Sequence, residues 1–321
     1  MTKYAGAAMR VLVVTNMYPS EEHPALGRFV RDQVESLRLI DGLEVELFAF
    51  SGGGWAPYAR AARELRARFR RERFDVVHAH YGLTGWSARG LRGAPLVVTF
   101  HGTDLAHTRV GRLSRALVPR LALPATVSAS LARSELDGAG VRRRVAVLPC
   151  GVDLDRFAPG DRRAARERLR LDPAGRYLLF PADPARPEKR ADRARLLAEA
   201  AGATLLTYDA THPDDVPDHV NAANAVVVTS EREGFGLATL EALACDVPVL
   251  ATDAGVAPLA LAGVPGTLCA PFELDAWLAA VRPHLDAADP RVPGRARAGL
   301  FDRRRMARRV AEAYRDLAAA G

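Results

Sequence analysis

The sequence predicts an α/β protein with two domains, each built on a parallel sheet. Short apolar runs alternate with amphipathic helical patterns along the 321 residues, which is the signature of strands joined by helical crossovers. The alternation forms two series, separated by a segment rich in glycine, proline and aspartate. Apolar residues make up 49% of the chain, enough for each domain to bury its own core.

The apolar runs predict the strands of both sheets. The first series has runs at residues 11–15, 45–50, 76–79, 96–100, 125–127 and 145–148. The second series has runs at 177–181, 204–208, 225–228 and 247–251, with a weaker candidate at 266–268.

The segment GVDLDRFAPGD, residues 151–161, predicts the hinge between the domains. We expect an N-terminal domain over residues 1–155 and a C-terminal domain over 156–301. A last helix is predicted at about 303–319 and should pack against the protein through one apolar face. That face carries Met306, Val310, Ala313, Tyr314 and Leu317.

Residues 228–253, VTSEREGFGLATLEALACDVPVLATD, carry the most specific chemical pattern. An apolar strand leads through a turn with Gly234 and Gly236 into a helix predicted from Leu237 to Ala244. Unpaired amides and the positive dipole end at such a helix start favour a phosphate or diphosphate. Glu233 and Glu241 would flank that anion, and carboxylates accept hydrogen bonds from paired sugar hydroxyls. The alternative is a pair of exposed acids near a helix start.

The string EGFGLATLEALACDVPVLATD resembles the signature of retaining family 4 glycosyltransferases. In that signature two glutamates separated by seven residues accompany a helix of small residues and a Pro-Val strand. The resemblance continues in VLVVTNMYPS, HAHYGLTGW, VVTFHGTDL and LPCGVDLDRF, which occur in the expected order. The opening NMYP and the segment FPADPARPEKR are similar to the teichuronic-acid and surface-polysaccharide enzymes of bacteria.

This resemblance implies the GT-B fold, with two Rossmann-like domains whose parallel sheets face across a cleft. The terminal helix, residues 302–321, would return to the N-terminal domain. The implied reaction moves a sugar from a nucleotide sugar, with UDP as the expected carrier, to a hydroxyl of a saccharide or lipid-linked acceptor. The nucleotide sugar is a substrate, so we expect no cofactor and no metal.

The resemblance also assigns roles to residues. Glu233 and His101 would be catalytic, with Glu233 holding the donor sugar and Glu241 the ribose. The donor-binding residues would further comprise Arg186, Lys189, Gly234, Phe235, Gly236 and Leu237. Gly27, in the loop after the first strand, would contact an acceptor or a phosphate, although a glycine there also suits a plain turn.

Some positions depart from the family pattern. Pro184 takes the place of a frequent arginine, so that Arg186 is displaced by two residues and Lys189 is the safer cation for the diphosphate. Asp246 stands where glycine is frequent, and the segment 255–257 replaces a usual pair of glycines. His78 and His80 lie on one side of a strand, where they suit a structural role better than a metal site.

The charge of the chain points away from nucleic acid. The formal net charge is +7, but basic and acidic residues are mixed along the helices, and no basic patch is interleaved with aromatic residues. Residues 59–74 predict a basic helix with Ala62, Leu65 and Phe69 at core spacing. Its arginines could meet anionic lipid, the alternative being a solvated face.

The three cysteines, Cys150, Cys245 and Cys269, show no metal-type spacing and suit a reducing compartment. The sequence shows neither a secretory leader nor a run long enough to cross a bilayer. We therefore expect a cytoplasmic protein, with the inner membrane face as a further location if the basic helix touches lipid.

Two other functions remain open from the sequence. A nucleotide-sugar epimerase on the same fold would bind the same donor but act on its sugar with acid and base groups. A non-catalytic scaffold would keep the fold as a binding surface, and the presence of both Glu233 and Glu241 speaks against it.

Overall fold

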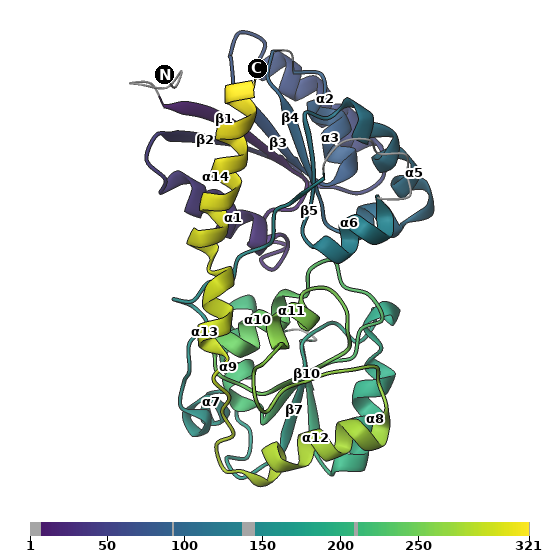
Figure 1. The fold of residues 1–321 in the computed structure, drawn as a ribbon, viewed down its shortest axis with the longest axis vertical. Coiled ribbons are helices and arrows are strands. Elements are labelled where there is room, and N and C mark those ends of the chain that lie inside the picture. Colours follow the sequence, from purple (N-terminus) through teal and green to yellow (C-terminus); the bar gives the residue numbers. More distant parts are fainter. Residues whose placement is uncertain (1–7, 92, 137–144, 209–210, 321) are drawn as a thin grey trace. The chain divides into compact units, whose positions relative to one another are not determined.

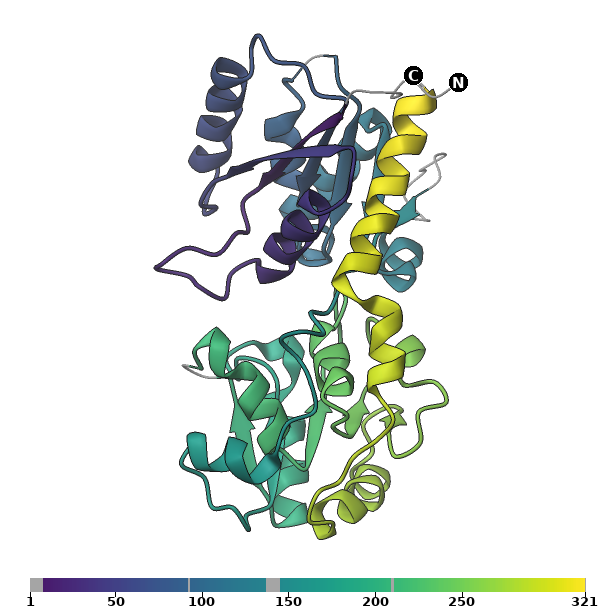
Figure 2. The ribbon, with the colours of Figure 1, turned by 90° about the vertical axis from the view of Figure 1, so that its left-hand side faces the viewer.

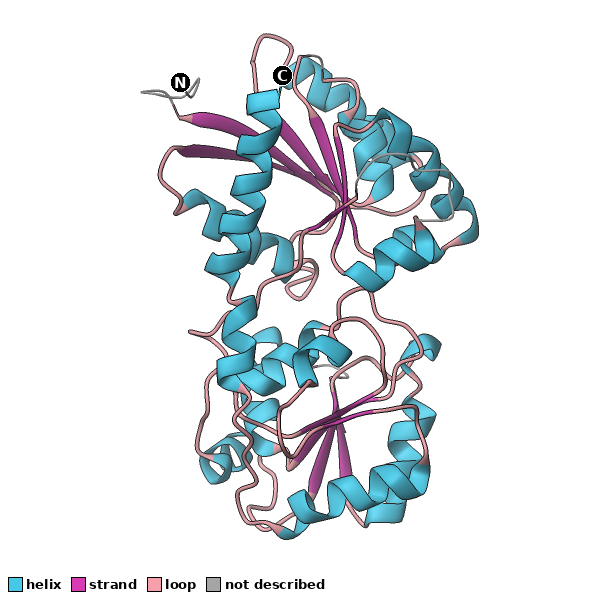
Figure 3. Cartoon of the chain, in the orientation of Figure 1, coloured by secondary structure: helices cyan, strands magenta, loops and turns pink. Residues whose placement is uncertain are grey.

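The computed structural model describes residues 8–91, 93–136, 145–208 and 211–320 (Figure 1). The chain forms two compact units. The first comprises Met1–Gly151 and Arg303–Gly321, and the second Val152–Asp302. The C-terminal helix therefore belongs to the first unit, and each unit has a parallel sheet of its own (Figure 3).

The sheet of the first unit has the strand order β2-β1-β3-β4-β5-β6, with every neighbouring pair parallel. Its strands are β1 (Met9–Thr15), β2 (Leu43–Ala49), β3 (Val76–His80), β4 (Leu96–Phe100), β5 (Leu123–Thr126) and β6 (Ala146–Val147). The strands β1, β3 and β4 are almost entirely buried because helices cover both faces of the sheet.

The helices of the first unit are α1 (Arg28–Arg38), α2 (Ala56–Arg68), α3 (Gly82–Ala88), α4 (Thr103–Ala106), α5 (Thr108–Leu117), α6 (Ala129–Glu135) and α14 (Arg303–Ala320). One face of the sheet packs against α1 and α14, which lie side by side (Figure 2). Val310 and Tyr314 of α14 are fully buried in this core, which confirms that the last helix packs through its predicted apolar face. The helix α3 contacts the strands β1, β3 and β4 and also α2 and α5.

The sheet of the second unit has the order β11-β10-β9-β7-β8 and is also parallel. Its strands are β7 (Tyr177–Phe180), β8 (Thr204–Thr207), β9 (Ala225–Val228), β10 (Val249–Ala251) and β11 (Leu268–Cys269). Its helices are α7 (Arg162–Arg168), α8 (Ala191–Ala201), α9 (Val216–Ala222), α10 (Leu237–Ala244), α11 (Ala257–Leu261), α12 (Leu274–Asp286) and α13 (Arg295–Ala298). One core joins the sheet to α8 and α12, around the fully buried Trp277.

The predicted strands are confirmed, most of them with ends shifted by one or two residues. The predicted helix over 59–74 is wrong at both ends, because α2 begins at Ala56, with Pro57 in its first turn, and ends at Arg68. Beyond Arg68 the chain folds back so that the rings of Phe69 and Phe74 pack edge to face at 5.3 Å. The buried face of α2 carries Ala61 in place of the predicted Ala62.

Candidate functional site

A pocket of about 230 Å³ opens in the second unit at the carboxyl ends of β7 and β9. The chain leaves β7 toward β8 on one side and later returns to β9 on the other, so the strand order reverses between β7 and β9. Ligands of open parallel sheets bind at such a reversal, because the loops diverge there. The pocket is lined by Phe180, Pro181, Ala182, Lys189, Tyr208, Val228, Ser230, Glu233, Gly236, Leu237, Ala238 and Glu241.

The loop between β9 and α10 positions Glu233. Ser230 donates a hydrogen bond from its hydroxyl to Oε1 of Glu233 at 2.7 Å. The hydroxyl of Thr229 lies 3.0 Å from the carbonyl oxygen of Lys189 and 2.9 Å from that of Arg190. These contacts join the loop after β9 to the loop after β7, so both loops present their side chains to one pocket.

Lys189 and Glu233 form an ion pair at this junction. The Nζ of Lys189 donates to both carboxylate oxygens of Glu233, each at 2.6 Å. The two side chains are 13% and 10% exposed, so the pair is largely removed from water. A lysine in this position can serve an anion and the glutamate together, because an ammonium has three donors.

Gly236 starts α10 in the left-handed conformation, with φ 87°. A side chain at this position would be strained, so the turn into the helix depends on glycine. Leu237 and Ala238 follow and line the pocket. The first amides of a helix lack partners within the helix and lie at the positive dipole end, which makes this edge of the pocket suitable for a phosphate.

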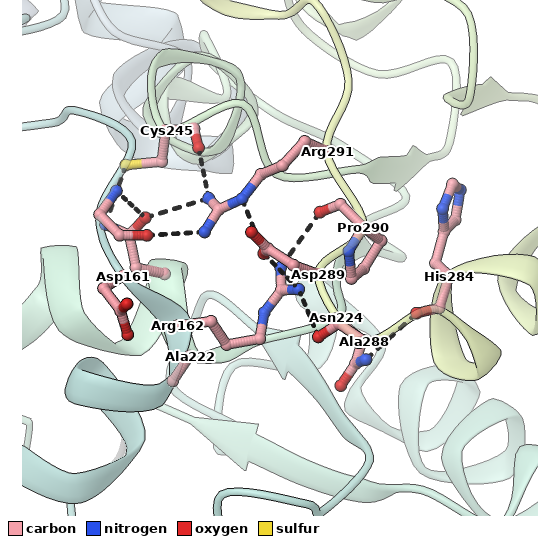
Figure 4. A network of polar contacts seen from close by, with 12 residues as sticks. Asp161, Arg162, Ala222, Asn224, Cys245, His284, Ala288, Asp289, Pro290 and Arg291 are labelled. Carbon is pink, nitrogen blue, oxygen red and sulfur yellow. Dashed lines mark hydrogen bonds and ion pairs between the residues drawn. The ribbon is translucent and has the colours of Figure 1, made fainter.

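The opposite end of α10 is held by arginines. Arg291 donates to the carbonyl oxygen of Cys245 at 2.9 Å, and Arg295 donates to that of Ala244 at 2.8 Å. Cations there satisfy the last carbonyls and match the negative dipole end. Arg291 in turn pairs with Asp289, which also binds the buried Arg162 at 2.7 Å (Figure 4). This network fixes the helix that carries Glu241.

Asp246 follows α10 with φ 55°, in the left-handed region. The strain of this conformation explains why glycine suits the position. Here the Asp246 carboxylate accepts a hydrogen bond from the amide of Arg295 at 2.7 Å, and its carbonyl accepts from the amide of Val292 at 2.9 Å. The aspartate therefore fastens the end of α10 to the chain before α13.

The structure brings together most of the predicted donor-binding residues. Lys189, Glu233, Gly236, Leu237 and Glu241 all line the pocket, with Glu241 one helical turn beyond Leu237.

Three predicted donor-binding residues do not line it. Arg186 is half-exposed and pairs with Glu188 at 2.6 Å. The side chain of Phe235 is buried and packs against Phe301 with ring centres 6.2 Å apart. Gly234 lies in the same turn, before the helix begins.

The predicted histidine of the first unit lies at the end of β4, in a row of three rings. Nε2 of His101 lies 3.1 Å from Nδ1 of His80, and the two rings are stacked. His78 follows on the same face of β3 and lies 2.5 Å from the hydroxyl of Tyr314 and 2.8 Å from that of Thr99. Burial lowers the pKa of His78 and of His101 to about 3 and that of His80 well below its ordinary value. All three rings are therefore neutral at physiological pH.

Asp104 ties the loops after β3 and β4 together. Its carboxylate accepts hydrogen bonds from the amides of Gly82, His101 and Gly102, each at 3.0 Å. Complete burial raises its pKa to about 6, against the effect of these bonds. Beside Gly82, Tyr81 has φ 85° and ψ 139°, a strained conformation of the kind that clusters at binding sites.

Gly27 precedes α1 in the left-handed conformation, with φ 66°. A Cβ at this position would lie 2.3 Å from the carbonyl oxygen of Met17, so the close approach of two chain segments requires glycine. This packing accounts for the residue structurally. Its contact with an acceptor or phosphate stays a prediction.

Sequence reasoning missed several residues of these sites. Ser230 lies two residues after the end of β9 and could have been suspected from its position near a strand end. Asp104 was missed although two of the amides that it accepts from, those of His101 and Gly102, are close in sequence. Tyr208 was missed because its place in the pocket depends on how separate segments pack. Gly255 was noted only as a departure, yet a Cβ there would lie 2.7 Å from Cβ of Glu233.

Within the described part of the chain, no group of three or more histidine, cysteine, aspartate or glutamate side chains is arranged to hold a metal ion. None of the helices in the described ranges has the length and apolar character needed to cross a membrane.

Comparison with known proteins matches both halves of the chain to sugar-transferring families. Residues 3–156 match Glycosyltransferase Family 4, and residues 165–286 match Glycosyl transferases group 1. A D-inositol 3-phosphate glycosyltransferase of Mycolicibacterium paratuberculosis is 32% identical over an alignment that covers 87% of this chain and 73% of the relative. The enzyme of the same name from Geodermatophilus obscurus is also 32% identical, over 75% of this chain and 66% of the relative. The chain thus spans about two thirds of the length of these curated relatives.

Solved structures share the fold at lower sequence identity. Sucrose-phosphate synthase from Thermosynechococcus elongatus has a TM-score of 0.76 at 18% identity, over 98% of this chain and 100% of that one. Anabaena HepE, solved in complex with UDP and glucose, has a TM-score of 0.66 at 16% identity, over 95% of this chain and 99% of that one. The two parallel-sheet units, the matched families and the relatives agree, and the chain belongs to the family 4 glycosyltransferases of GT-B fold.

Proposed function

We propose that this chain transfers a sugar from a UDP-sugar to a hydroxyl acceptor with retention of anomeric configuration. The observation that carries the proposal is the pocket of the second unit, in which Glu233, Glu241 and Lys189 surround the start of α10. Two acids separated by a helix start and a cation match a donor that has hydroxyls at both ends and a diphosphate between them. HepE, which shares the fold, binds UDP and glucose.

Each residue has a proposed role. Glu233 holds hydroxyls of the donor sugar, Glu241 holds the ribose, and Lys189 with the amides of Leu237 and Ala238 holds the diphosphate. Arg186 can reach the diphosphate only by leaving Glu188, so its part is secondary. His101 is the proposed catalytic residue of the first unit, where it would contact the transferred sugar as a neutral ring.

The chemistry needs no cofactor or metal in this proposal. The acceptor hydroxyl oxygen forms a bond to the anomeric carbon while the bond from that carbon to the phosphate oxygen breaks. The hydroxyl proton passes to the departing phosphate, which serves as the base on the same face of the sugar. Lys189 and the helix dipole stabilise the charge that grows on the leaving diphosphate.

The acceptor is a saccharide, a lipid-linked saccharide or a sugar-like phosphate of the kind that the relatives' name, D-inositol 3-phosphate glycosyltransferase, contains. A cell-surface polysaccharide or a glycolipid is the product class we propose. The basic helix α2 would serve a lipid-linked acceptor by contact with anionic lipid, and vesicles that contain phosphatidylglycerol test this by co-sedimentation.

A thermal-shift panel with UDP, GDP and ADP tests the donor, and UDP should raise the melting temperature most. Incubation with UDP-glucose, UDP-galactose and UDP-N-acetylglucosamine then tests transfer to myo-inositol 3-phosphate and to lipid-linked saccharides. NMR of the product should show the anomeric configuration of the donor. Formation of an isomerised UDP-sugar without acceptor would favour the epimerase, and failure of all three nucleotides to bind would favour a scaffold.

A further inference from the structure

Tyr208 contributes to the pocket a polar group that the proposed function leaves unused. It follows β8 directly, and β8 pairs in register with β7, so that Thr207 lies opposite Phe180. Tyr208 and Pro181 therefore emerge from neighbouring strands at the same level, and both line the pocket. The residue thus stands at the carboxyl edge of the sheet, where ligands bind.

The hydroxyl of Tyr208 is shielded from solvent and has no hydrogen-bond partner in the part of the chain that the structure describes. A buried hydroxyl without a partner lowers the free energy of unfolding, so proteins rarely keep one without a use. The Glu241 carboxylate, the Cys245 thiol and the Arg156 guanidinium act electrostatically on this hydroxyl. Burial and the Glu241 carboxylate raise the pKa of Tyr208 well above its ordinary value, so the hydroxyl keeps its proton.

Cys245, the residue that caps α10, follows Glu241 by four residues and therefore lies on the same side of the helix. Tyr208 and Glu241 both line the pocket, and the Glu241 carboxylate acts electrostatically on the Tyr208 hydroxyl, so we assign this hydroxyl to the Glu241 side of the pocket. Lys189 and Glu233 pair with each other at 2.6 Å in the same pocket, and they are the residues proposed for the diphosphate and the donor sugar. The position suits the nucleoside part of a donor better than its sugar or diphosphate.

We propose that Tyr208 is a nucleoside-recognition residue, whose hydroxyl donates a hydrogen bond to the ribose that Glu241 also holds. The inference rests on the proposed function, because it requires a nucleotide in this pocket. It adds a hydroxyl donor beside the carboxylate acceptor of Glu241. A ribose hydroxyl can give a hydrogen bond to Glu241 and accept one from Tyr208, so the two residues complement each other.

Tyr208→Phe tests the proposal because it removes only the hydroxyl. Isothermal titration of the full chain with whichever of UDP, GDP and ADP binds most tightly should show about tenfold weaker affinity. The melting temperature without nucleotide should be equal or higher, since an unsatisfied polar group is removed. Tyr177→Phe is the matched control: the hydroxyl of Tyr177 donates to the carbonyl of Asp172 at 3.3 Å, away from the pocket, and its loss should leave the affinity unchanged.

A double variant with Glu241→Ala locates the contact. If both groups meet the same ribose, the two losses should not add, because neighbouring groups on one ligand are coupled. Unchanged affinity in Tyr208→Phe, or additive losses, would overturn the ribose assignment. A lower melting temperature with unchanged affinity would also overturn it, because the hydroxyl would then serve the fold. If the unaltered chain binds no nucleotide, the proposed function itself fails.

Discussion

The Nζ of Lys189 lies 2.6 Å from each carboxylate oxygen of Glu233, and Ser230 donates to the same carboxylate. The cation and the acid that we propose for donor binding thus neutralise each other in this structure. A diphosphate that enters the pocket can share the ammonium with Glu233, because lysine has a donor for each. Each residue of the pair compensates the buried charge of the other.

Lys189→Met should destabilise the second unit by roughly 3 kcal/mol, because it leaves the Glu233 carboxylate buried without its cation. Glu233→Gln should destabilise the second unit by a similar amount, because it leaves the Lys189 ammonium without its carboxylate. The double variant should be more stable than the sum of the two single losses predicts, and urea denaturation of all four proteins measures this coupling. Strictly additive losses would show that the two charges do not interact in solution.

Glu241→Ala should weaken nucleotide binding by about 10- to 100-fold, since charge-assisted hydrogen bonds contribute about 1.5–3 kcal/mol. Titration calorimetry with UDP measures the loss. Glu199→Ala, an exposed acid on α8 that does not line the pocket, is the control and should bind as the unaltered chain does. Equal affinity in both variants would remove Glu241 from the ribose.

The sequence predicted the elements that local pattern determines. The strand Ala225–Val228 and the helix Leu237–Ala244 were predicted to the residue, because an apolar run and a glycine turn mark their limits. Glu233 and Glu241 were found for the same reason. The pairing of Arg186 with Glu188, two residues further on, is a choice of side-chain conformation that the order of the residues does not decide. The unpartnered hydroxyl of Tyr208 depends on how separate segments pack, which no local pattern encodes.

Gly255→Ala should destabilise the second unit and weaken donor binding together. Gly255 has φ 62°, and an added Cβ would lie 2.4 Å from the carbonyl oxygen of Phe235 and 2.7 Å from Cβ of Glu233. The added Cβ must displace the loop that holds Phe235 and Glu233. This should lower the free energy of unfolding by at least about 1–3 kcal/mol. Denaturation and UDP titration check the two effects.

Gly202→Ala is the matched control for this change. Gly202 also has φ 62°, but nothing lies within 4 Å of an added Cβ. It should show the backbone strain alone, with unchanged UDP affinity. If Gly255→Ala binds UDP as tightly as Gly202→Ala does, the close packing of Gly255 against Glu233 does not affect donor binding.

The row of three histidines, His78, His80 and His101, should make the protein less stable in mild acid. Their pKa values in the folded state lie below the unfolded value near 6.5, at about 3 for His78 and His101. Between these two pKa values the unfolded chain binds protons that the folded chain does not. The free energy of unfolding therefore falls as pH falls below 6.5, by up to about 1.4 kcal/mol per pH unit for each histidine. Asp104, with its pKa raised to about 6, opposes this in part, because its folded form gains a proton between pH 6 and 3.8.

Urea denaturation between pH 4.5 and 7.5 measures this slope. His101→Gln removes one titrating ring and should lower the slope by about 1.4 kcal/mol per pH unit where the ring would titrate. A variant slope equal to that of the unaltered chain would mean that His101 accepts a proton in the folded state.

The row of histidines also predicts where the proton of His101 lies. Nε2 of His80 is buried and lacks a partner among the described residues, while its Nδ1 lies 3.1 Å from Nε2 of His101. Buried N–H groups without an acceptor are rare, so His80 should carry its proton on Nδ1 and donate it to His101. His101 would then keep its own proton on Nδ1. Long-range ¹H–¹⁵N correlation spectra of the histidine rings distinguish the tautomers, and a protonated Nε2 on His80 would contradict this assignment. His80→Gln should release the constraint and let His101 populate both tautomers.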